Sequence, residues 1–238
     1  MTGALRGRHA LVTGGGRGIG LAICGELAAR GAKVSVVIRS AGVRADVTSA
    51  QELDRAFEAC RRANGPISVL VNNSGIAESA PFVRTDRAMW DRIVATNLTG
   101  TFLCTQSAIR DMIAAKWGRV VNVASIAGLF GAPYISAYCA SKHGVVGLTR
   151  ALAAEFAATG VTFNVVCPGY TQTDMMRQAI ESIVRHAGVS EDAARDRLAE
   201  SNPGGRILSP GEVARAVADL CEGEENGREV VLPQPASA

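Results

Sequence analysis

The chain has 238 residues, of which 47% are hydrophobic and 20% charged, so it is long enough for one large domain with an ample apolar core. Its net charge of +3 is too small to indicate a nucleic-acid partner or binding to a charged membrane surface. The six cysteines show neither a C-x-x-C pair nor zinc spacing, and His9, His143 and His186 form no ligand cluster, so no metal site is expected.

Two further observations bear on location. The N-terminal residues hold no apolar run of signal-peptide length, which predicts a cytoplasmic protein. Residues 120–141 are uncharged and long enough to cross a membrane, but they include Asn122, Pro133, three serines and two tyrosines, which would be costly in hydrocarbon. We interpret this stretch as an interior strand that runs into an active-site loop, and we expect no membrane partner.

A glycine-rich turn near the N-terminus has the context of a dinucleotide site. Residues 9–13 form a short apolar run typical of a strand, and residues 21–32 have helical periodicity. Between them, Gly14, Gly18 and Gly20 allow a tight turn and the close approach of a diphosphate to the start of the helix. This order predicts nucleotide binding. The alternative is a glycine-rich connector without a ligand.

The next expected strand, residues 33–38, bears on the choice of cofactor. In dinucleotide folds an acidic residue at the tip of this strand binds the 2′-hydroxyl of NAD, whereas a basic residue pairs with the 2′-phosphate of NADP. Here the tip carries Arg39, and Arg17 lies in the glycine turn beside the same expected pocket. Two guanidiniums suit a phosphate, which favours NADP, with NAD possible. The alternative is that either arginine faces solvent.

The connection to the third strand is unusually short. Only residues 41–45 separate Ser40 from Asp46, whereas a crossover that contains a helix needs a dozen or more residues. We therefore expect the helix between strands 2 and 3 to be missing and the third strand to be a stub. Asp46 stands where an acid that contacts adenine is expected. Residues 48–64 read as an amphipathic helix with Thr48 or Ser49 as its N-cap.

The remaining pattern alternates strands with helices. Strands are expected at residues 67–71, 119–123, 162–167 and 228–232, and helices at 88–116 with a break near 99–100, at 138–159 and at 210–221. This predicts an α/β fold, a single-domain Rossmann-type doubly wound parallel sheet over residues 1–238. Residues 174–203 look like a helical insertion over the site. Its arginines could bind a substrate phosphate, but acidic residues balance them, which favours a solvated substrate lid.

A tyrosine and a lysine form a candidate catalytic pair. Tyr138 and Lys142 are four residues apart in a run that reads as helix, so they share a face. A neighbouring ammonium is expected to lower the pKa of the phenol toward the working range. The alternative is a chance Y-x-x-x-K pattern with a surface lysine. Ser125 follows the strand at 119–123. Asn97, near the helix break, either has a functional role or forms hydrogen bonds to nearby backbone groups.

Taken together, the motifs resemble the classical short-chain dehydrogenase/reductase family over nearly the whole chain. The matching motifs are T-G-G-G-R-G-I-G at 13–20, Asp46-Val47, Asn72-Asn73-Ser74-Gly75, Asn97, Ser125, Y-C-A-S-K at 138–142, and Pro168-Gly169 followed by Thr171 and Thr173. Each motif alone is weak evidence for the family, but their order and spacing together make the resemblance strong.

The resemblance implies catalytic roles for four residues. Tyr138 would be the acid in ketone reduction and the base in alcohol oxidation. Lys142 would lower its pKa and bind the nicotinamide ribose, and Ser125 would hold the carbonyl oxygen of the substrate. Asn97 would support a proton relay behind Lys142.

The resemblance also implies a set of cofactor-binding residues. Thr171 and Thr173 would fix the nicotinamide carboxamide, and Asn72 and Gly75 would lie near the adenosine side. The implied cofactor-binding residues are Gly14, Arg17, Gly18, Ile19, Gly20, Arg39, Asp46, Val47, Asn73, Gly75, Tyr138, Lys142, Pro168, Gly169, Thr171 and Thr173.

Within the family, residues 138–150 and 207–221 look most like β-ketoacyl and acetoacetyl-CoA reductases. This implies an NADP-dependent reductase of a ketone, above all of a 3-oxoacyl thioester of coenzyme A or of an acyl carrier protein. The alternatives are an NAD-dependent secondary alcohol or 3-hydroxyacyl-CoA dehydrogenase, and a non-catalytic cofactor-binding sensor.

The family packs its two long helices between subunits, which implies a homotetramer or homodimer. The tail, residues 232–235, departs from the family's D-G-G, so its contacts are expected to differ.

Overall fold

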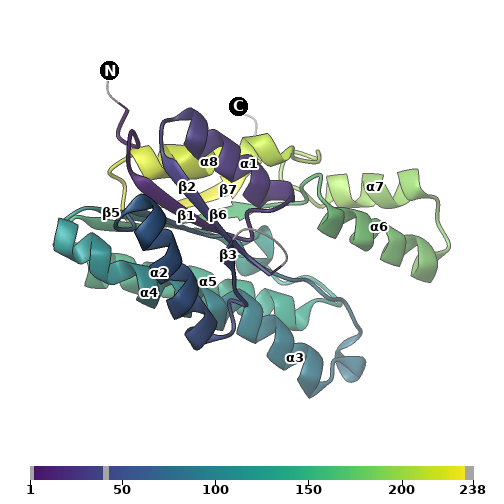
Figure 1. Cartoon of the computed structure of the whole chain (residues 1–238). Coiled ribbons are helices and arrows are strands. Elements are labelled where there is room, and N and C mark those ends of the chain that lie inside the picture. The colour runs from purple at the N-terminus through teal and green to yellow at the C-terminus, as the bar shows by residue number, and fades with distance from the viewer. Residues whose placement is uncertain (1–2, 40–42, 234–238) are drawn as a thin grey trace.

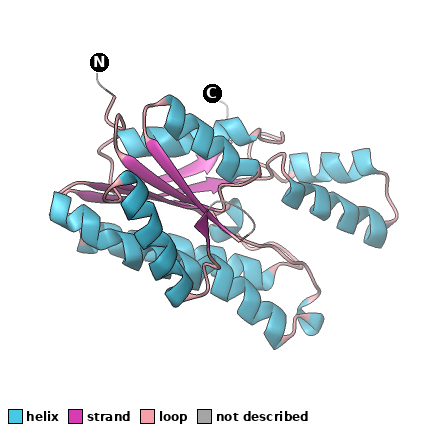
Figure 2. Ribbon diagram, viewed as in Figure 1, coloured by secondary structure: helices cyan, strands magenta, loops and turns pink. Residues whose placement is uncertain are grey.

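Seven parallel strands form one continuous sheet in the computed structural model, which describes residues 3–39 and 43–233. The strand order is β3-β2-β1-β4-β5-β6-β7. Figure 2 shows the strands, in magenta, between two layers of helices. The strands are β1 (His9–Thr13), β2 (Lys33–Ile38), β3 (Val43–Arg44), β4 (Val69–Asn72), β5 (Gly118–Val123), β6 (Val161–Pro168) and β7 (Glu229–Leu232). The order reverses between β1 and β4, so the crevice at their carboxyl ends is the expected ligand site. The predicted doubly wound sheet is confirmed.

Helices cover both faces of the sheet (Figure 1). On one face lie α1 (Gly18–Ala29) and α8 (Pro210–Glu222), and on the other lie α2 (Ala50–Asn64), α4 (Gly100–Ala115) and α5 (Ser136–Glu155). Apolar side chains from the central strands are buried against both helical layers. This double burial explains why β4, β5 and β6 are all buried along their length and read as nearly continuous apolar runs.

Side-chain caps fix where several helices begin. Ser49 accepts a hydrogen bond from the Glu52 N–H and caps α2, which confirms one of the two predicted caps. At α8, Ser209 and Glu212 form a reciprocal capping box, and Pro210 occupies the first turn. These local signals set the helix boundaries that lead into and out of the carboxyl edge of the sheet.

The third strand is the predicted stub. β3 contains two residues and pairs in parallel with the end of β2, with Val43 opposite Val37 and Arg44 opposite Ile38. It lies just before Asp46. Among the described residues between β2 and β3 there is only Arg39, which belongs to no helix; residues 40–42, including Ser40, lie outside the described part. The short connection therefore brings Arg44 directly beside the tip of β2.

The predicted helix break is a π-helical segment. α3 (Arg87–Val94) continues into a π-helix over Ala95–Thr99, and α4 starts at Gly100. A Cβ atom at Gly100 would lie 2.8 Å from a methyl of Val47, so only glycine allows this approach. The break is thus centred a few residues before the predicted position, and it contains Asn97. Such π-bulges frequently occur at functional sites.

Two helices stand apart from the sheet. α6 (Asp174–Ala187) and α7 (Glu191–Glu200) project beyond the end of β6 and pack against each other (Figure 1). They bury a small apolar cluster of their own, Met176, Ile180, Ala194 and Leu198. In residues 3–39 and 43–233, no helix combines the length and apolar character needed to cross a bilayer. The predicted departures at Gln234 and Pro235 lie outside the described residues.

Candidate active site

The glycine turn after β1 is packed too closely for side chains. A Cβ atom at Gly20 would lie 2.2 Å from the carbonyl oxygen of Gly14, which itself has φ +67°. The Asn73 side-chain amide donates to the carbonyls of Thr13 and Gly14, at 3.1 Å each. Asn73 therefore joins the carboxyl ends of β4 and β1 and holds the turn in shape.

The rest of this turn faces α6. A Cβ atom at Gly18 would lie 3.2 Å from Thr173, and Ile19 packs against the core under α1. The guanidinium of Arg17 is largely exposed and lies 3.6 Å from the carboxylate of Asp174. Arg17 thus contacts the first turn of α6, and its expected place beside the pocket at the tip of β2 stays a prediction.

The tip of β2 carries two arginines. Arg39 is exposed there, and Arg44 Nε donates to the Arg39 carbonyl at 3.2 Å. Asp46 accepts hydrogen bonds from the Thr48 N–H at 2.9 Å and the Thr48 hydroxyl at 2.8 Å. The backbone bond is the main cause that lowers the pKa of Asp46, with a contribution from the charge of Arg39. Val47 is buried. Sequence reasoning missed Arg44, because only the shortened crossover brings it to this tip.

Asn72 and Gly75, from the motif at 72–75, have different surroundings. Asn72 is buried, and its amide donates to the Thr105 hydroxyl at 3.0 Å and to Asn122 Oδ1 at 2.9 Å. It joins β4 to α4 and β5, so the expectation that it lies beside adenosine is wrong. A Cβ atom at Gly75 would lie 3.3 Å from Asn97 Oδ1 and 3.6 Å from Lys142 Nζ.

The π-helix turns the side chain of Asn97 toward α5. Its Oδ1 accepts from the Ile76 N–H at 2.9 Å, and its Nδ2 donates to the Ile76 carbonyl at 3.0 Å and to the Ser141 hydroxyl at 3.0 Å. Ser141 in turn donates to the Tyr138 carbonyl at 2.8 Å. Sequence reasoning did not single out Ser141. The buried Asn97 therefore contacts the first two turns of α5, where the candidate catalytic pair lies.

Ser125 and Tyr138 meet at the carboxyl end of β5. Ser125 lies two residues after the end of the strand and accepts from the Ala127 N–H at 3.1 Å, which caps a short 3₁₀ turn (Ile126–Gly128). Tyr138 is half-buried, and burial raises the pKa of its phenol to about 12, while a hydrogen bond with the Ser125 side chain opposes that rise. The phenol is thus fully protonated near neutral pH.

Lys142 is only 5% exposed. Its ammonium donates to the Val123 carbonyl at 2.9 Å and lies 5.7 Å from the centre of the Tyr138 ring. Burial lowers the pKa of Lys142 to about 8. The ammonium would therefore lose its proton before the phenol does, and the expected lowering of the Tyr138 pKa is wrong for this arrangement. Near pH 7 the pair is an ammonium beside a neutral phenol.

The segment after β6 returns toward the glycine turn. Pro168 pairs with Leu232, and the Gly169 N–H donates to the Leu232 carbonyl at 2.8 Å. Thr171 is buried and donates to the Gly169 carbonyl at 3.0 Å. Thr173 caps α6 by accepting from the Met176 N–H. The two predicted threonines thus lie at or just before the start of α6, and Thr173 is close to Gly18.

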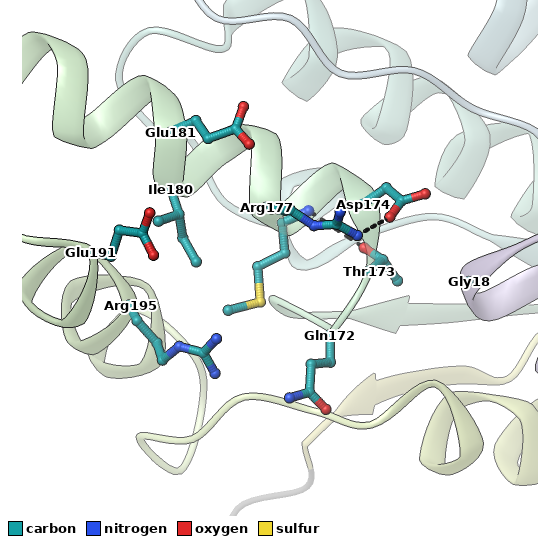
Figure 3. A pocket seen from close by; sticks show the side chains of 10 residues that line it. Gly18, Gln172, Thr173, Asp174, Arg177, Ile180, Glu181, Glu191 and Arg195 are labelled. Carbon is teal, nitrogen blue, oxygen red and sulfur yellow. Dashed lines mark hydrogen bonds and ion pairs between the residues drawn. The ribbon is translucent and has the colours of Figure 1, made fainter.

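A cavity of about 500 Å³ lies between these helices and the glycine turn (Figure 3). Its lining residues are Gly18, Gln172, Thr173, Asp174, Met176, Arg177, Ile180, Glu181, Glu191 and Arg195. The charges are mixed, and the Arg177 guanidinium pairs with Asp174. The cavity therefore combines charges of both signs with the apolar side chains of Met176 and Ile180, rather than a surface of one charge.

The chain's other reactive side chains are dispersed. All six cysteines are free thiols, and five of them are buried. Over the ranges that the structure describes, no three His, Cys, Asp or Glu side chains gather closely enough to hold a metal ion.

Comparison with known proteins supplies the family. The short chain dehydrogenase family model matches residues 8–183. The 3-oxoacyl-[acyl-carrier-protein] reductase MabA of Mycobacterium tuberculosis is 40% identical over 220 residues, which cover 90% of this chain and 85% of that protein. The 2-(S)-hydroxypropyl-CoM dehydrogenase 3 of Xanthobacter autotrophicus is 39% identical over 92% of this chain and 91% of its own length.

A solved structure agrees in fold and in sequence. A crystal structure of a variant actinorhodin polyketide ketoreductase with NADPH superimposes with a TM-score of 0.90 and 35% identity. The match covers 94% of this chain and 95% of that one. The family resemblance predicted from the motifs is confirmed. The chain therefore belongs to the short-chain dehydrogenase family and is an NAD(P)-dependent oxidoreductase.

Proposed function

We propose that the chain reduces a 3-oxoacyl thioester with NADPH and that Tyr138 donates the proton. The observation that carries this proposal is the meeting of Tyr138, Ser125 and Lys142 at the carboxyl end of β5, on the same edge of the sheet as the tight glycine turn. The similarity to a 3-oxoacyl-[acyl-carrier-protein] reductase and to a polyketide ketoreductase supports a β-keto substrate carried on a thioester.

The glycine turn fits a dinucleotide. The missing side chains at Gly14 and Gly20 allow backbone contact with a diphosphate, and the Arg17 side chain does not cap α1, so the first N–H groups of that helix remain available. We assign the diphosphate to this turn and to Gly18 and Ile19. When bound, the nicotinamide supplies a hydride.

The remaining contacts would be spread along the crevice. Thr171 and Thr173, on the segment that begins at Pro168-Gly169, would hold the carboxamide, since this segment brings Thr173 next to Gly18 and Thr171 lies two residues before it. Asp46 and Val47 would border the adenine, and Gly75 would allow the ribose to approach Lys142. These assignments follow from which residues line the same carboxyl edge of the sheet.

The proton chemistry follows from the protonation states of the pair. The neutral Tyr138 phenol can give its proton to a substrate oxygen that the Ser125 hydroxyl also contacts. The phenolate that remains would face the Lys142 ammonium. The attraction between these opposite charges in a partly buried site stabilises the phenolate that the proton transfer leaves behind. Asn97 would keep this turn of α5 in place through Ser141.

Selection for NADP would depend on the tip of β2. Arg39 and Arg44 are both at this tip, and charge-assisted hydrogen bonds to a 2′-phosphate are worth about 1.5–3 kcal/mol each. We expect Arg39→Ala and Arg44→Ala each to raise the Kd for NADPH by about 10-fold or more with little change for NADH. Arg17→Ala is the comparison variant: it also removes an exposed arginine, but one that pairs with Asp174 on α6. Equal losses for both cofactors would contradict the assignment.

A second candidate is oxidation of a secondary alcohol with NAD, which the similarity to 2-(S)-hydroxypropyl-CoM dehydrogenase 3 favours. That direction requires the Tyr138 phenolate as base. Burial raises the pKa of Tyr138 to about 12, which stabilises the protonated form and favours reduction near pH 7.

One assay separates the two candidates. Acetoacetyl-CoA is offered with NADPH and with NADH, and 3-hydroxybutyryl-CoA and simple secondary alcohols with NADP and NAD, all at pH 7, while nicotinamide absorbance is followed. The proposal predicts the highest kcat/KM for acetoacetyl-CoA with NADPH. It is contradicted if only alcohols with NAD are turned over, or if cofactor binds and no substrate reacts, as a sensor would behave.

We also propose a homotetramer or homodimer that works in the cytoplasm. Phe102 and Ile113 lie on one face of α4 and are 45% and 42% exposed, which suits a face that another subunit covers. The free, mostly buried thiols suit a reducing compartment. Light scattering after gel filtration tests the assembly, and a monomer at micromolar concentration would contradict it.

A further inference from the structure

A buried asparagine ties the far end of the projecting helices to the cofactor-binding segment. Asn202 follows α7 in the chain and is only 4% exposed. It lies 32 residues from Tyr170 in sequence, yet its side chain binds the backbone of that residue. Sequence reasoning gave Asn202 no role beyond its place in the insertion at residues 174–203.

Both the oxygen and the nitrogen of the Asn202 side-chain amide form hydrogen bonds to backbone groups. Its Oδ1 accepts from the Tyr170 N–H at 2.6 Å, and its Nδ2 donates to the Tyr170 carbonyl at 2.9 Å and to the Arg206 carbonyl at 2.7 Å. The amide orientation is unambiguous, because a backbone N–H faces one atom and two carbonyls face the other. The side chain thus pairs with Tyr170 as a neighbouring strand would.

The same side chain accounts for a glycine in the cofactor motif. A Cβ atom at Gly169 would lie 2.2 Å from Asn202 Oδ1, 2.7 Å from Cγ and 3.3 Å from Nδ2. All three of these nearest atoms belong to Asn202, and the φ angle of Gly169 is not in the left-handed region that requires glycine. The need for glycine at this position therefore comes from the Asn202 amide.

The contact closes a loop around α6 and α7. The chain leaves the sheet through residues 168–173 and returns through residues 202–208, where the Gln172 N–H donates to the Leu208 carbonyl and the Leu208 N–H to the Tyr170 carbonyl. Asn202 extends this pairing by one more residue. Both ends of the projecting helices are thus fixed to the segment that carries Thr171 and Thr173.

We infer that Asn202 is a positioning residue: it sets the placement of Thr171 and Thr173, and so couples the position of α6 and α7 to nicotinamide binding. The inference rests on the proposed role of these two threonines. Its primary readout is cofactor affinity, which does not depend on which substrate is reduced, so failure of the proposed substrate would leave this test intact.

The first test compares Asn202→Ala with Asn226→Ala. Asn226 is a matched control, since its amide also binds two backbone groups, the Phe163 N–H and the Ala153 carbonyl, away from the site. NADPH binding is measured by fluorescence titration and stability by thermal unfolding. We expect Asn202→Ala to raise the Kd at least 10-fold and lower kcat, and Asn226→Ala to leave the Kd within 2-fold. An unchanged Kd for Asn202→Ala, or an equal rise for Asn226→Ala, would overturn the inference.

The second test uses the contact with Gly169. We expect Gly169→Ala to raise the Kd for NADPH at least 10-fold in the otherwise unchanged chain. In the Asn202→Ala background the three close atoms are gone, so adding Gly169→Ala should raise the Kd by less than 2-fold more. Equal fold-changes in both backgrounds would show that the two residues act independently and would reject the positioning role. If Asn202→Ala alone does not fold, Asn202→Ser serves as the background.

Discussion

Replacing Lys142 by methionine tests whether a buried charge lies behind the candidate catalytic tyrosine. Lys142 is 5% exposed, and burial lowers its pKa from 10.5 to about 8. Methionine has a similar length and is unbranched, so it can fill the same space without a charge. The substitution also removes the hydrogen bond to the Val123 carbonyl, which shifts stability by an amount that varies little with pH.

The pH dependence of stability gives the magnitude. Between pH 8 and 10.5 the unfolded lysine holds a proton that the folded one has lost, so the free energy of unfolding of the unmodified chain rises with pH. The pKa difference of 10.5 − 8 = 2.5 units corresponds to about 3 kcal/mol. Below pH 8 both states are protonated and the cost of the buried charge is constant. The Lys142→Met chain lacks this rise.

The assay is equilibrium unfolding in urea at several pH values from 7 to 10.5, at one protein concentration because an oligomer's stability depends on it. We expect the difference in unfolding free energy between the unmodified chain and Lys142→Met to change by about 3 kcal/mol over this range. Lys33→Met, at the exposed start of β2, is the matched control. Parallel pH dependences for the unmodified chain and Lys142→Met would refute the buried-ammonium interpretation.

Two further predictions concern the cofactor turn and the reaction. Gly20→Ala should destabilise the fold by about 1–3 kcal/mol and abolish NADPH binding, because the new Cβ would lie 2.2 Å from the Gly14 carbonyl; normal binding in a titration would contradict this packing. For ketone reduction, kcat/KM should fall about 10-fold per pH unit above pH 8, since burial lowers the pKa of Lys142 to about 8 and the ammonium is then lost. A flat profile up to pH 9.5 would show that its charge is not needed.

The motifs predicted the fold well because each pattern depends only on residues that are close together in the sequence. Apolar runs that end in Thr13, Asn72 or Val123 are strands buried on both faces, and a glycine turn between a strand and a helix is typical of a dinucleotide-binding fold. The short connection before Asp46 correctly predicted a stub, since chain length alone forbids a crossover helix.

The errors came from properties that depend on surroundings. Asn72 and Asn73 are neighbours in sequence, but Asn72 is buried between β4, β5 and α4 while Asn73 binds the glycine turn. The i, i+4 spacing placed Lys142 next to Tyr138 but could not show how deeply both are buried, and burial is what reverses the expected order of their pKa values.

Contacts between residues far apart in the sequence could not be predicted either. Arg17 faces Asp174 on α6, and Arg44 reaches the β2 tip only through the parallel pairing of the stub. Asn202 contacts Tyr170 across the whole projecting pair of helices. None of these partners is marked by a motif or a spacing, because each pairing is decided by how the segments return to the sheet.

The role of Tyr138 as proton donor is tested by the activity of Tyr138→Phe. The substitution removes only the phenol oxygen, so NADPH should bind with a Kd within about 2-fold of the unmodified chain, while kcat for acetoacetyl-CoA reduction falls by about 10²–10⁴, the usual contribution of a positioned acid. Fluorescence titration measures the Kd, and stopped-flow single turnovers with prebound NADPH measure the rate of reduction. Reduction at near-normal rate by Tyr138→Phe would contradict the claim that Tyr138 supplies the proton.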